Sequence, residues 1–176
     1  DKKYGVFQDD VPFFKEVASN LGLQSRGDVN VMSYNRHPLA FLVEAADDIC
    51  YTLIDFEDGI NLGWIPEETA LEYLVNLVKD SLNKEKYAKL SQSKDRLAYL
   101  RALAINTLIS EAVQIFIENE TEILKGDFNV SLLEKSKYQA QISDIIKTSI
   151  ANVYQSPEVV EKELAGYKIL STLLDG

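Results

Sequence analysis

The chain has 176 residues, of which 46% are hydrophobic, and this is enough for one domain with a sizeable core. Its net charge of −10 does not favour a surface that binds nucleic-acid phosphates, so we expect nucleic acid at most as a regulator. The single cysteine, Cys50, excludes an internal disulfide, and no run of about 18 uninterrupted apolar residues is present. Both observations favour a cytoplasmic protein that does not span a membrane.

The first predicted elements are a short helix and a loop. The helix covers residues 9–23, because Asp9 or Asp10 can cap its start and Gly22 can close it in the left-handed conformation. Residues 24–36 are polar and aperiodic, which predicts a loop with a short extended piece at residues 29–32.

Two helices that begin at prolines follow. Pro38 fits the first position of a helix that runs to Gly59, and its apolar residues recur every three or four positions. Gly59 and Gly63 are expected to mark its end. Pro66 begins the next helix, with two glutamates in the first turn that complement the helix dipole.

The second half of the chain is also predicted to be helical. One helix extends from about Ser93 to Leu124, longer than the usual ~10–14 residues. Ser131 and Glu134 have the spacing of a capping box for a helix that continues to about Tyr154, and a last helix begins at residues 156–157. These patterns predict an all-α fold.

The helix that contains "FLVEAADDICYTLIDFEDG" carries an unusual number of acids. Asp47, Tyr51, Asp55 and Asp58 stand at i, i+4, i+8 and i+11, which places them in one narrow stripe. A charged stripe is usually a solvated helix face, but residues 38–59 contain no lysine or arginine. The residues alone leave two interpretations open, a solvated face or a site for a cation or a donor-rich ligand.

The residues do not suffice for a complete metal centre. A catalytic metal generally needs three or more protein ligands, and the chain has one histidine, His37, which we expect to cap the helix at Pro38. Cys50 points off the acidic stripe and is expected to be a small buried hydrophobic residue.

The deoxyguanosine triphosphate triphosphohydrolases, members of the HD-domain metallohydrolases, have a signature segment that closely resembles "RHPLAFLVEAADDICYTLIDFEDG". The similarity continues through "RALAINTLISEAVQIFIENE" and "VYQSPEVVEKELAGYKILSTLLD". The resemblance implies a partial HD-domain-like helical fold. Residues 1–64 would be part of its catalytic core, and residues 65–176 would be a C-terminal helical region packed on that core, the two forming one continuous domain.

The resemblance also implies roles for residues of the acidic helix. Asp47 would be the last ligand of a divalent metal, such as Mg²⁺ or Mn²⁺, while Tyr51 and Asp55 would face the nucleotide sugar. Asp48 and Glu44 would support these residues without contacting the metal or the nucleotide. The histidine and the His-Asp pair that complete the family's metal site are absent from the sequence. We therefore expect a C-terminal fragment whose missing ligands lie before Asp1, and which is inactive alone whether or not it binds a metal.

The resemblance finally implies hydrolysis of dGTP, or a related deoxynucleoside triphosphate, to deoxynucleoside and triphosphate by a homo-oligomeric parent enzyme. The triphosphate contacts are predicted in the basic stretch between residues 84 and 101, at Lys94, Arg96 and Arg101, for which a solvated basic face is the alternative. Two other functions stay open. One is an HD phosphohydrolase with another nucleotide specificity, and the other is a non-enzymatic helical module for oligomerisation or regulation.

Overall fold

Helices dominate the computed structural model, which describes residues 5–26 and 32–175, and this confirms the predicted all-α class. The strands found in this part of the chain form one small antiparallel pair, β1 (Ser25–Arg26) and β2 (Ser33–Tyr34). The α-helices are α1 (Val11–Asn20), α2 (Pro38–Asn61), α3 (Glu67–Val78), α4 (Lys84–Lys89), α5 (Ser93–Glu118), α6 (Glu120–Lys125), α7 (Gln139–Ser149) and α8 (Pro157–Leu174). Shorter turns are the 3₁₀ turns η1 (Gln8–Asp10) and η2 (Leu133–Lys135) and the π-helical turn η3 (Ile150–Tyr154).

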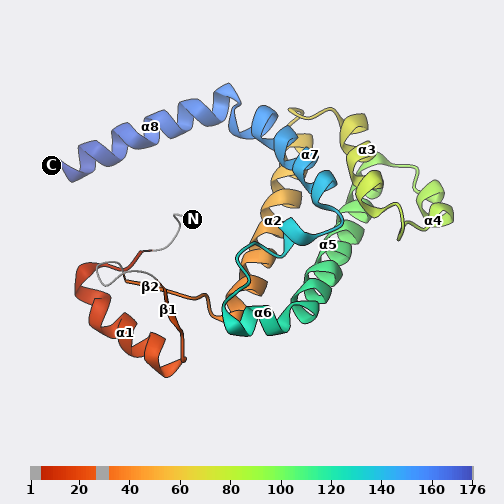
Figure 1. The fold of residues 1–176 in the computed structure, drawn as a ribbon. Helices are drawn as coiled ribbons and strands as arrows, with labels where there is room; N and C mark the ends of the chain where they lie inside the picture. Colours follow the sequence, from red (N-terminus) through yellow and green to blue (C-terminus); the bar gives the residue numbers. More distant parts are fainter. Residues whose placement is uncertain (1–4, 27–31, 176) are drawn as a thin grey trace.

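Four helices form the packed body of the molecule. Helix α2 packs against α5 and α7, and α3 contacts the same two helices, so the four lie side by side (Figure 1). Their apolar faces meet in one core, in which Leu53 of α2, Leu77 of α3, Leu100 and Leu108 of α5 and Ile145 of α7 are almost fully buried. The body therefore holds α2 by one side only and leaves its other side open.

Helix α5 is both long and apolar. It is 26 residues long with a mean hydropathy of 1.4 over its most apolar window, which by length and composition alone would allow it to cross a membrane. A core helix of a soluble protein meets the same criteria, and here Leu97, Leu100, Ala104 and Leu108 face α2 and α3 in the core. One such helix is weak evidence for a membrane span, and nothing else in the described residues indicates one.

Most of the predicted helix starts and stops are confirmed, although neither Asp9 nor Asp10 caps α1 with its side chain. The Nδ1 atom of His37 accepts a hydrogen bond from the Leu39 backbone N–H at 3.2 Å, so His37 caps α2 and Pro38 is the first helical residue. The Ser156 hydroxyl caps α8 in the same way. Gly22, which follows α1, adopts a positive φ of 65° as predicted.

Three predicted boundaries were wrong. The long helix stops at Glu118, where the Asn119 side-chain amide donates to the Ile115 carbonyl at 2.7 Å and helps to close the last turn, and α6 begins after it. Ser131 and Glu134 do form the reciprocal bonds of a capping box, both 3.2 Å long, but they enclose only the 3₁₀ turn η2. Of the two glycines expected to mark the end of α2, Gly63 follows the C-cap residue Leu62 with a φ of 75° as expected, whereas the helix continues past Gly59 to Asn61.

The predicted extended piece falls mostly outside the described residues. Residues 29–31 are not described, and the strands that are seen, Ser25–Arg26 and Ser33–Tyr34, lie on either side of them. The short hairpin is tied to the body through the Arg26 guanidinium, which donates a hydrogen bond to the Asn129 side chain.

A buried carboxylate fixes the segment before α7. Glu111 on α5 is only 9% exposed, and its Oε1 accepts the Lys137 backbone N–H at 3.1 Å. Its other oxygen lies 3.3 Å from the Lys137 ammonium, and this bond and charge raise the pKa of Lys137 above its usual value. Because η2 and α7 are joined through this segment, Glu111 helps to hold the wall that α7 presents to α2.

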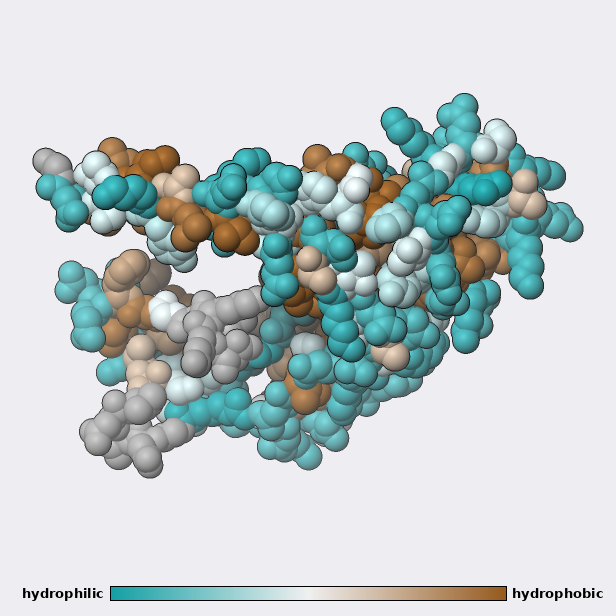
Figure 2. Space-filling view, turned by 90° about the horizontal axis from the view of Figure 1, so that it is seen from above, coloured by the Kyte–Doolittle hydropathy of each residue, from teal (hydrophilic) through white to brown (hydrophobic). Residues whose placement is uncertain are grey.

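The two ends of the described chain are packed very differently from the body. Helix α8 extends away as a single rod and has no buried residue, and α1 buries only Ala18 (Figure 1). The space-filling view shows an open gap between α8 and the N-terminal part, with hydrophobic side chains along α8 (Figure 2). The open side of α2 lies between these two ends.

Candidate functional site

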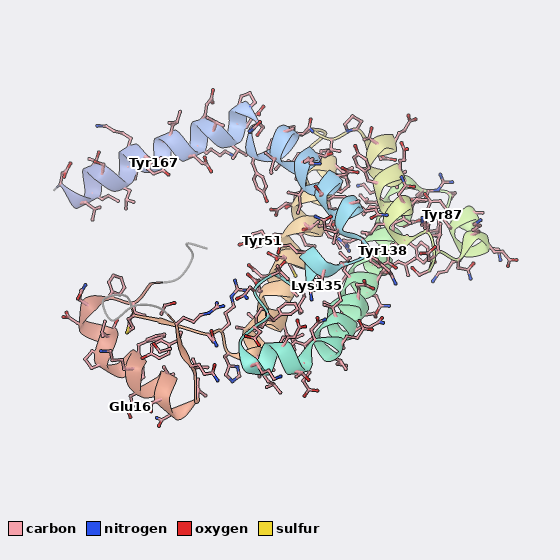
Figure 3. The ribbon with its side chains drawn as sticks, viewed as in Figure 1. Glu16, Tyr51, Tyr87, Lys135, Tyr138 and Tyr167 are labelled. Carbon is pink, nitrogen blue, oxygen red and sulfur yellow. The ribbon has the colours of Figure 1, made fainter. Side chains whose placement is uncertain are left out.

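The acidic stripe of α2 lies on the open side of the helix. Asp47, Tyr51 and Asp58 are exposed and Asp55 is half-buried, whereas Thr52 and its buried neighbours face the body. The Tyr51 ring projects into the space beside α2, toward the side on which α1 and α8 lie (Figure 3). Cys50 is also exposed, so the expectation that it is buried was wrong.

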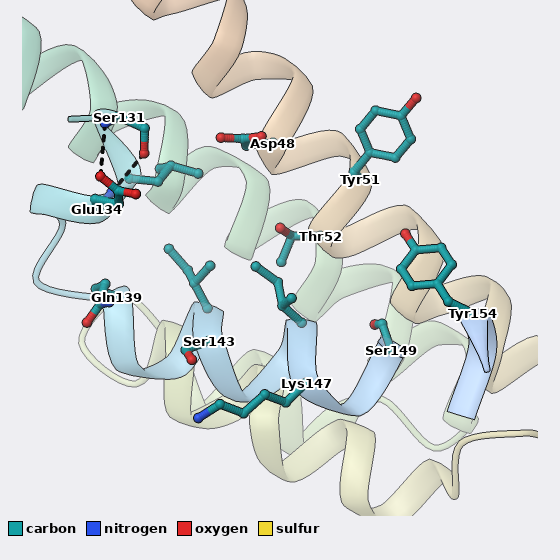
Figure 4. Close-up of a pocket in the computed structure, with 13 residues that line it drawn as sticks. Asp48, Tyr51, Thr52, Ser131, Glu134, Gln139, Ser143, Lys147, Ser149 and Tyr154 are labelled. Carbon is teal, nitrogen blue, oxygen red and sulfur yellow. Dashed lines mark hydrogen bonds between the residues drawn. The ribbon is translucent and has the colours of Figure 1, made fainter. Parts of the chain in front are cut away.

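The structure adds a residue to the stripe that the sequence did not indicate. The Tyr154 hydroxyl, 99 positions away along the chain, donates a hydrogen bond to the Asp55 carboxylate. Tyr51 precedes Asp55 by one helical turn on α2, and the Tyr51 and Tyr154 rings lie near each other at one end of the cavity lining (Figure 4). A carboxylate held by one phenol and flanked by a second is a defined polar site rather than a uniformly solvated face.

A close helix contact brings Tyr154 to this position. Tyr154 ends the π-helical turn η3, and the residue before it, Val153, packs against α2 at Gly59. A Cβ on Gly59 would lie 2.6 Å from Val153 Cγ2 and 2.7 Å from Ile65 Cδ1, so a larger residue would force these side chains to shift. Gly59 is one turn after Asp55, and the contact therefore sets Tyr154 beside that carboxylate. π-helical turns are frequent at functional sites.

The environment keeps the Tyr154 phenol protonated. Partial burial, the hydrogen bond to Asp55 and the negative charge of that carboxylate together raise the pKa of Tyr154 from 10.0 to about 12. Tyr154 is consequently a hydrogen-bond donor at neutral pH, and it leaves lone pairs of Asp55 available to accept from a ligand.

A cavity of about 440 Å³ opens between α2 and α7 next to these residues (Figure 4). Its size is within the range of small-molecule sites, roughly 300–1,000 Å³. The residues that line it are Asp48, Tyr51, Thr52, Ser131, Leu133, Glu134, Gln139, Ile142, Ser143, Ile146, Lys147, Ser149 and Tyr154.

Polar groups in this cavity are able to bind a ligand. Ser149 is 3% exposed, and its hydroxyl has no hydrogen-bond partner among the described residues. A buried hydroxyl without a partner is unfavourable by about 1–3 kcal/mol, which a ligand or a water would recover. The charged lining residues are the carboxylates of Asp48 and Glu134 and one cation, Lys147. The lining is thus suited to a neutral polar group better than to a polyanion.

Of the predicted site residues on α2, Tyr51 and Asp48 line this cavity, whereas Asp47, Asp55 and Glu44 do not. Glu44 forms an ion pair with Arg36 at 2.5 Å near the start of α2. Arg101 pairs with Glu57 on α2. Neither arginine lines the cavity.

The remaining two predicted phosphate contacts lie at the start of α5. Lys94 is exposed, and Arg96 donates from Nε to the Leu90 carbonyl at 2.7 Å and lies over the Tyr87 ring. Neither residue lines the cavity between α2 and α7. Their role in binding a triphosphate stays a prediction.

The described residues do not form a metal site. Between residues 5 and 26 and between 32 and 175, no group of three or more His, Cys, Asp or Glu side chains could hold a metal ion. The one histidine, His37, uses Nδ1 as the cap of α2. Asp47 by itself provides one carboxylate, which does not fit a catalytic metal that needs three or more protein ligands.

The comparisons with known proteins give the family. No protein-family model matches the chain. The deoxyguanosinetriphosphate triphosphohydrolase-like protein of Synechocystis sp. is 38% identical over 98% of this chain. The deoxyguanosinetriphosphate triphosphohydrolase of Yersinia enterocolitica is 30% identical over 99% of it, and a triphosphohydrolase-like protein of Pseudomonas aeruginosa is 32% identical over 98%. The chain belongs to the deoxyguanosinetriphosphate triphosphohydrolase family.

The match covers only part of each family member. The chain spans 38% of the length of the Synechocystis protein, 36% of the Yersinia protein and 39% of the Pseudomonas protein. The family assignment made from "EAADDICY" and its surroundings is confirmed. Most of each relative's sequence has no counterpart in these 176 residues.

Proposed function

We propose that this chain forms the nucleoside-binding side of the active site in an HD-type deoxynucleoside triphosphate triphosphohydrolase. The proposed reaction of the longer protein is hydrolysis of dGTP, or a related deoxynucleoside triphosphate, to deoxynucleoside and triphosphate. The names of the relatives support the substrate class. The observation that carries the proposal is the Asp55–Tyr154 hydrogen bond beside Tyr51, at a cavity large enough for a nucleoside.

The proposed roles follow from what each side chain offers. Asp55 accepts a hydrogen bond from the sugar hydroxyl, because Tyr154 occupies only part of its acceptor capacity. Tyr51 is 60% exposed and presents its ring to one face of the sugar. Tyr154 orients the Asp55 carboxylate and stays protonated, so that its own charge does not oppose the bound nucleotide.

The triphosphate requires positive charge that the cavity does not provide. Two carboxylates and one lysine line the cavity, and a triphosphate would meet unfavourable charges there. Lys94, Arg96 and Arg101 are proposed as phosphate contacts, which for Arg101 requires that it share or leave its pairing with Glu57.

Asp47 is proposed as one ligand of a divalent metal in the longer protein. Because the described residues do not fit a complete metal site, we assign no catalytic step of this chain to the metal. Hydrolysis is accordingly proposed for a longer, homo-oligomeric and cytoplasmic enzyme, and this chain alone is expected to show no turnover of dGTP. Measurable dGTP hydrolysis by the 176-residue chain would contradict this assignment of roles.

The test is a titration of this chain with 2′-deoxyguanosine, followed by the chemical shifts of its backbone amides. We expect shifts at Tyr51, Asp55 and Tyr154, and an affinity about five- to tenfold lower for Asp55→Asn, because a neutral amide oxygen accepts a weaker hydrogen bond than a carboxylate. Tyr154→Phe removes the hydroxyl that orients Asp55 and is expected to weaken binding. Its matched control, Tyr167→Phe on exposed α8, is expected to bind as the unmodified chain does.

The same titration separates the alternatives. We expect dGTP to bind this chain no more tightly than 2′-deoxyguanosine, because Lys147 is the one cation among the described residues of the cavity lining, against two carboxylates, and Arg101 is paired with Glu57. Tighter binding of another nucleoside or of a nucleoside monophosphate would favour an HD phosphohydrolase of different specificity. Absence of binding, or binding that Asp55→Asn leaves unchanged, would contradict the proposed site.

A further inference from the structure

The cavity between α2 and α7 has two ends with different chemistry. The two tyrosines of the proposed sugar site lie at one end, and three polar residues, Ser131, Glu134 and Gln139, lie at the other (Figure 4). Between the ends, α7 contributes the apolar side chains of Ile142 and Ile146. A nucleoside whose sugar lies beside the tyrosines therefore directs the flat faces of its base along apolar side chains and the far edge of its base toward Glu134.

Glu134 is held in place by a capping box that starts no α-helix. The Ser131 backbone N–H donates to Glu134 Oε2, and the Glu134 backbone N–H donates to the Ser131 hydroxyl, both at 3.2 Å. A capping box normally begins an α-helix, whereas this one encloses the 3₁₀ turn η2 of three residues. Its effect is to fix a carboxylate that is exposed at the cavity, and none of the described residues donates to the other oxygen, Oε1.

Ser149 is independent evidence that this cavity binds a polar ligand. Its hydroxyl lies in the lining, the residue is 3% exposed, and no described residue forms a hydrogen bond with this hydroxyl. A hydroxyl within a helix is commonly satisfied by the carbonyl one turn earlier, as in the adjacent Thr148, which donates to the Asp144 carbonyl at 2.9 Å. Because Ser149 lacks this bond, its hydroxyl is available to a group inside the cavity.

The charges of the lining define the class of ligand. Asp48 and Glu134 contribute two carboxylates, and the one cation among the described lining residues, Lys147, is 73% exposed and lies 3.8 Å from the carboxylate of Asp144. Two carboxylates are too few for a catalytic metal centre, and the described residues contain no group of three potential metal ligands. The complementary ligand is an uncharged group that is rich in N–H donors.

Among the four bases of DNA, guanine has the edge that matches a carboxylate. Its N1–H and N2–H groups are adjacent and point in the same direction, and a carboxylate accepts two such parallel hydrogen bonds. In adenine and cytosine the amino group lies next to an acceptor nitrogen of the ring, and in thymine the N3–H lies between two carbonyl oxygens. Each of these edges places lone pairs against the carboxylate, which is unfavourable.

We infer that Glu134 determines the base preference of the proposed nucleoside site, by accepting two hydrogen bonds from the N1–H and N2–H groups of guanine. This inference rests on the proposed function, because the sugar contacts at Asp55 and Tyr51 direct the base toward Glu134. Ser131 is a positioning residue in this arrangement, since its two bonds hold the Glu134 side chain at the cavity.

The test compares three nucleosides on the unmodified chain and on Glu134→Gln, with affinities taken from the chemical shifts of the backbone amides. Glutamine also forms capping boxes, so η2 is retained, but its amide presents a donor to the guanine edge. The unmodified chain is expected to bind 2′-deoxyguanosine about tenfold more tightly than 2′-deoxyinosine, which lacks the 2-amino group, or 2′-deoxyadenosine. In Glu134→Gln, the affinity for 2′-deoxyguanosine is expected to fall to about that for 2′-deoxyinosine.

The control is Glu72→Gln, the same substitution on α3 at an exposed position that does not line the cavity. It is expected to leave all three affinities unchanged. The melting temperature of Glu134→Gln is expected to equal that of the unmodified chain, which separates the loss of a contact with the base from a loss of structure.

The outcomes separate this inference from the proposed function. If Asp55→Asn weakens binding but Glu134→Gln weakens all three nucleosides equally, or none of them, the inference is overturned and the nucleoside site stands. Equal affinities of the unmodified chain for 2′-deoxyguanosine and 2′-deoxyadenosine would also overturn it. If Glu134→Gln abolishes the preference for guanine while Asp55→Asn changes nothing, the inference stands and the proposed sugar contact fails. Absence of binding by all three nucleosides would overturn both.

Discussion

The helices of the body and helix α8 have similar amphipathic sequences, but the body buries its apolar faces and α8 leaves its apolar face exposed. In the body, Leu108 of α5 is 0% exposed between neighbouring helices, whereas Leu164 of α8 is 64% exposed although it also lies on an apolar helix face. The difference does not arise from composition, because both helices are rich in leucine and isoleucine. It arises from whether another element of the same chain reaches the apolar face.

This contrast separates two contributions of an apolar face. Inside the body, burial stabilises the fold of these 176 residues, at roughly 25 cal/mol for each Å² of apolar surface removed from water. On α8 and the open side of α2 the same kind of residue adds little to this fold and is available for a contact with other polypeptide. Substitutions at paired positions in the two regions are therefore expected to change the free energy of unfolding by different amounts and, for one pair, in opposite directions.

The largest expected difference is between two leucines. Leu108→Ala is expected to lower the free energy of unfolding by about 2–5 kcal/mol, because it leaves a cavity in the core. Leu164→Ala is expected to change it by no more than about 0.5 kcal/mol, because the side chain is already in water. Urea unfolding followed by circular dichroism measures both values. Equal losses for the two variants would show that α8 packs on the body in solution.

Replacing two glycines by alanine is expected to change the free energy of unfolding by smaller amounts, with opposite signs in the two regions. Gly59→Ala gains about 0.5–1 kcal/mol of helix propensity but overpacks Val153 and Ile65, an effect of about 1–3 kcal/mol, so we expect a net loss near 1 kcal/mol. Gly166→Ala in α8 meets no atom within 4 Å and is expected to stabilise the chain by about 0.5–1 kcal/mol, or less if α8 unfolds separately. Both are measured by urea unfolding; a stabilised Gly59→Ala variant would show that η3 does not pack closely on α2.

A further expected difference is a dependence of the free energy of unfolding on pH. The pKa of Tyr154 rises from 10.0 to about 12 on folding, so its stabilising contribution is present below pH 10 and is lost as the pH increases toward 12. Tyr154→Phe is expected to remove this part of the decline, and Tyr167→Phe on α8 is expected to retain it. The measurement is the free energy of unfolding at a series of pH values, which gives its slope against pH for each variant. Identical slopes for the unmodified chain and Tyr154→Phe would argue against the Asp55–Tyr154 bond.

Sequence patterns predicted the helices well where the signal is local. His37 and Pro38 fix the start of α2 through atoms two residues apart, and Ser156 fixes the start of α8 in the same manner. The break at Asn119 and the short turn at Ser131 depend on competition between a side chain and the helix backbone, which the hydrophobic pattern does not reveal.

The site was predicted less completely than the fold. The spacing of Asp47, Tyr51 and Asp55 identified the open stripe of α2, and the resemblance to the family gave each residue a proposed role. Tyr154 was missed because its contact joins positions 99 residues apart and depends on a π-helical turn that has no simple sequence pattern. Gly59, an interior glycine in a strongly helical segment, was the one local sign that other side chains pack closely on α2 there.

The turn η3 has a mechanical consequence because it joins the site directly to the rod. Tyr154 ends the turn, and α8 begins three residues later at Pro157. An 18-residue helix is about 27 Å long, so a rotation of about 10° at its base moves its far end by about 5 Å. A small change in backbone geometry at Tyr154 would therefore be magnified into a displacement of several ångströms at the tip of α8.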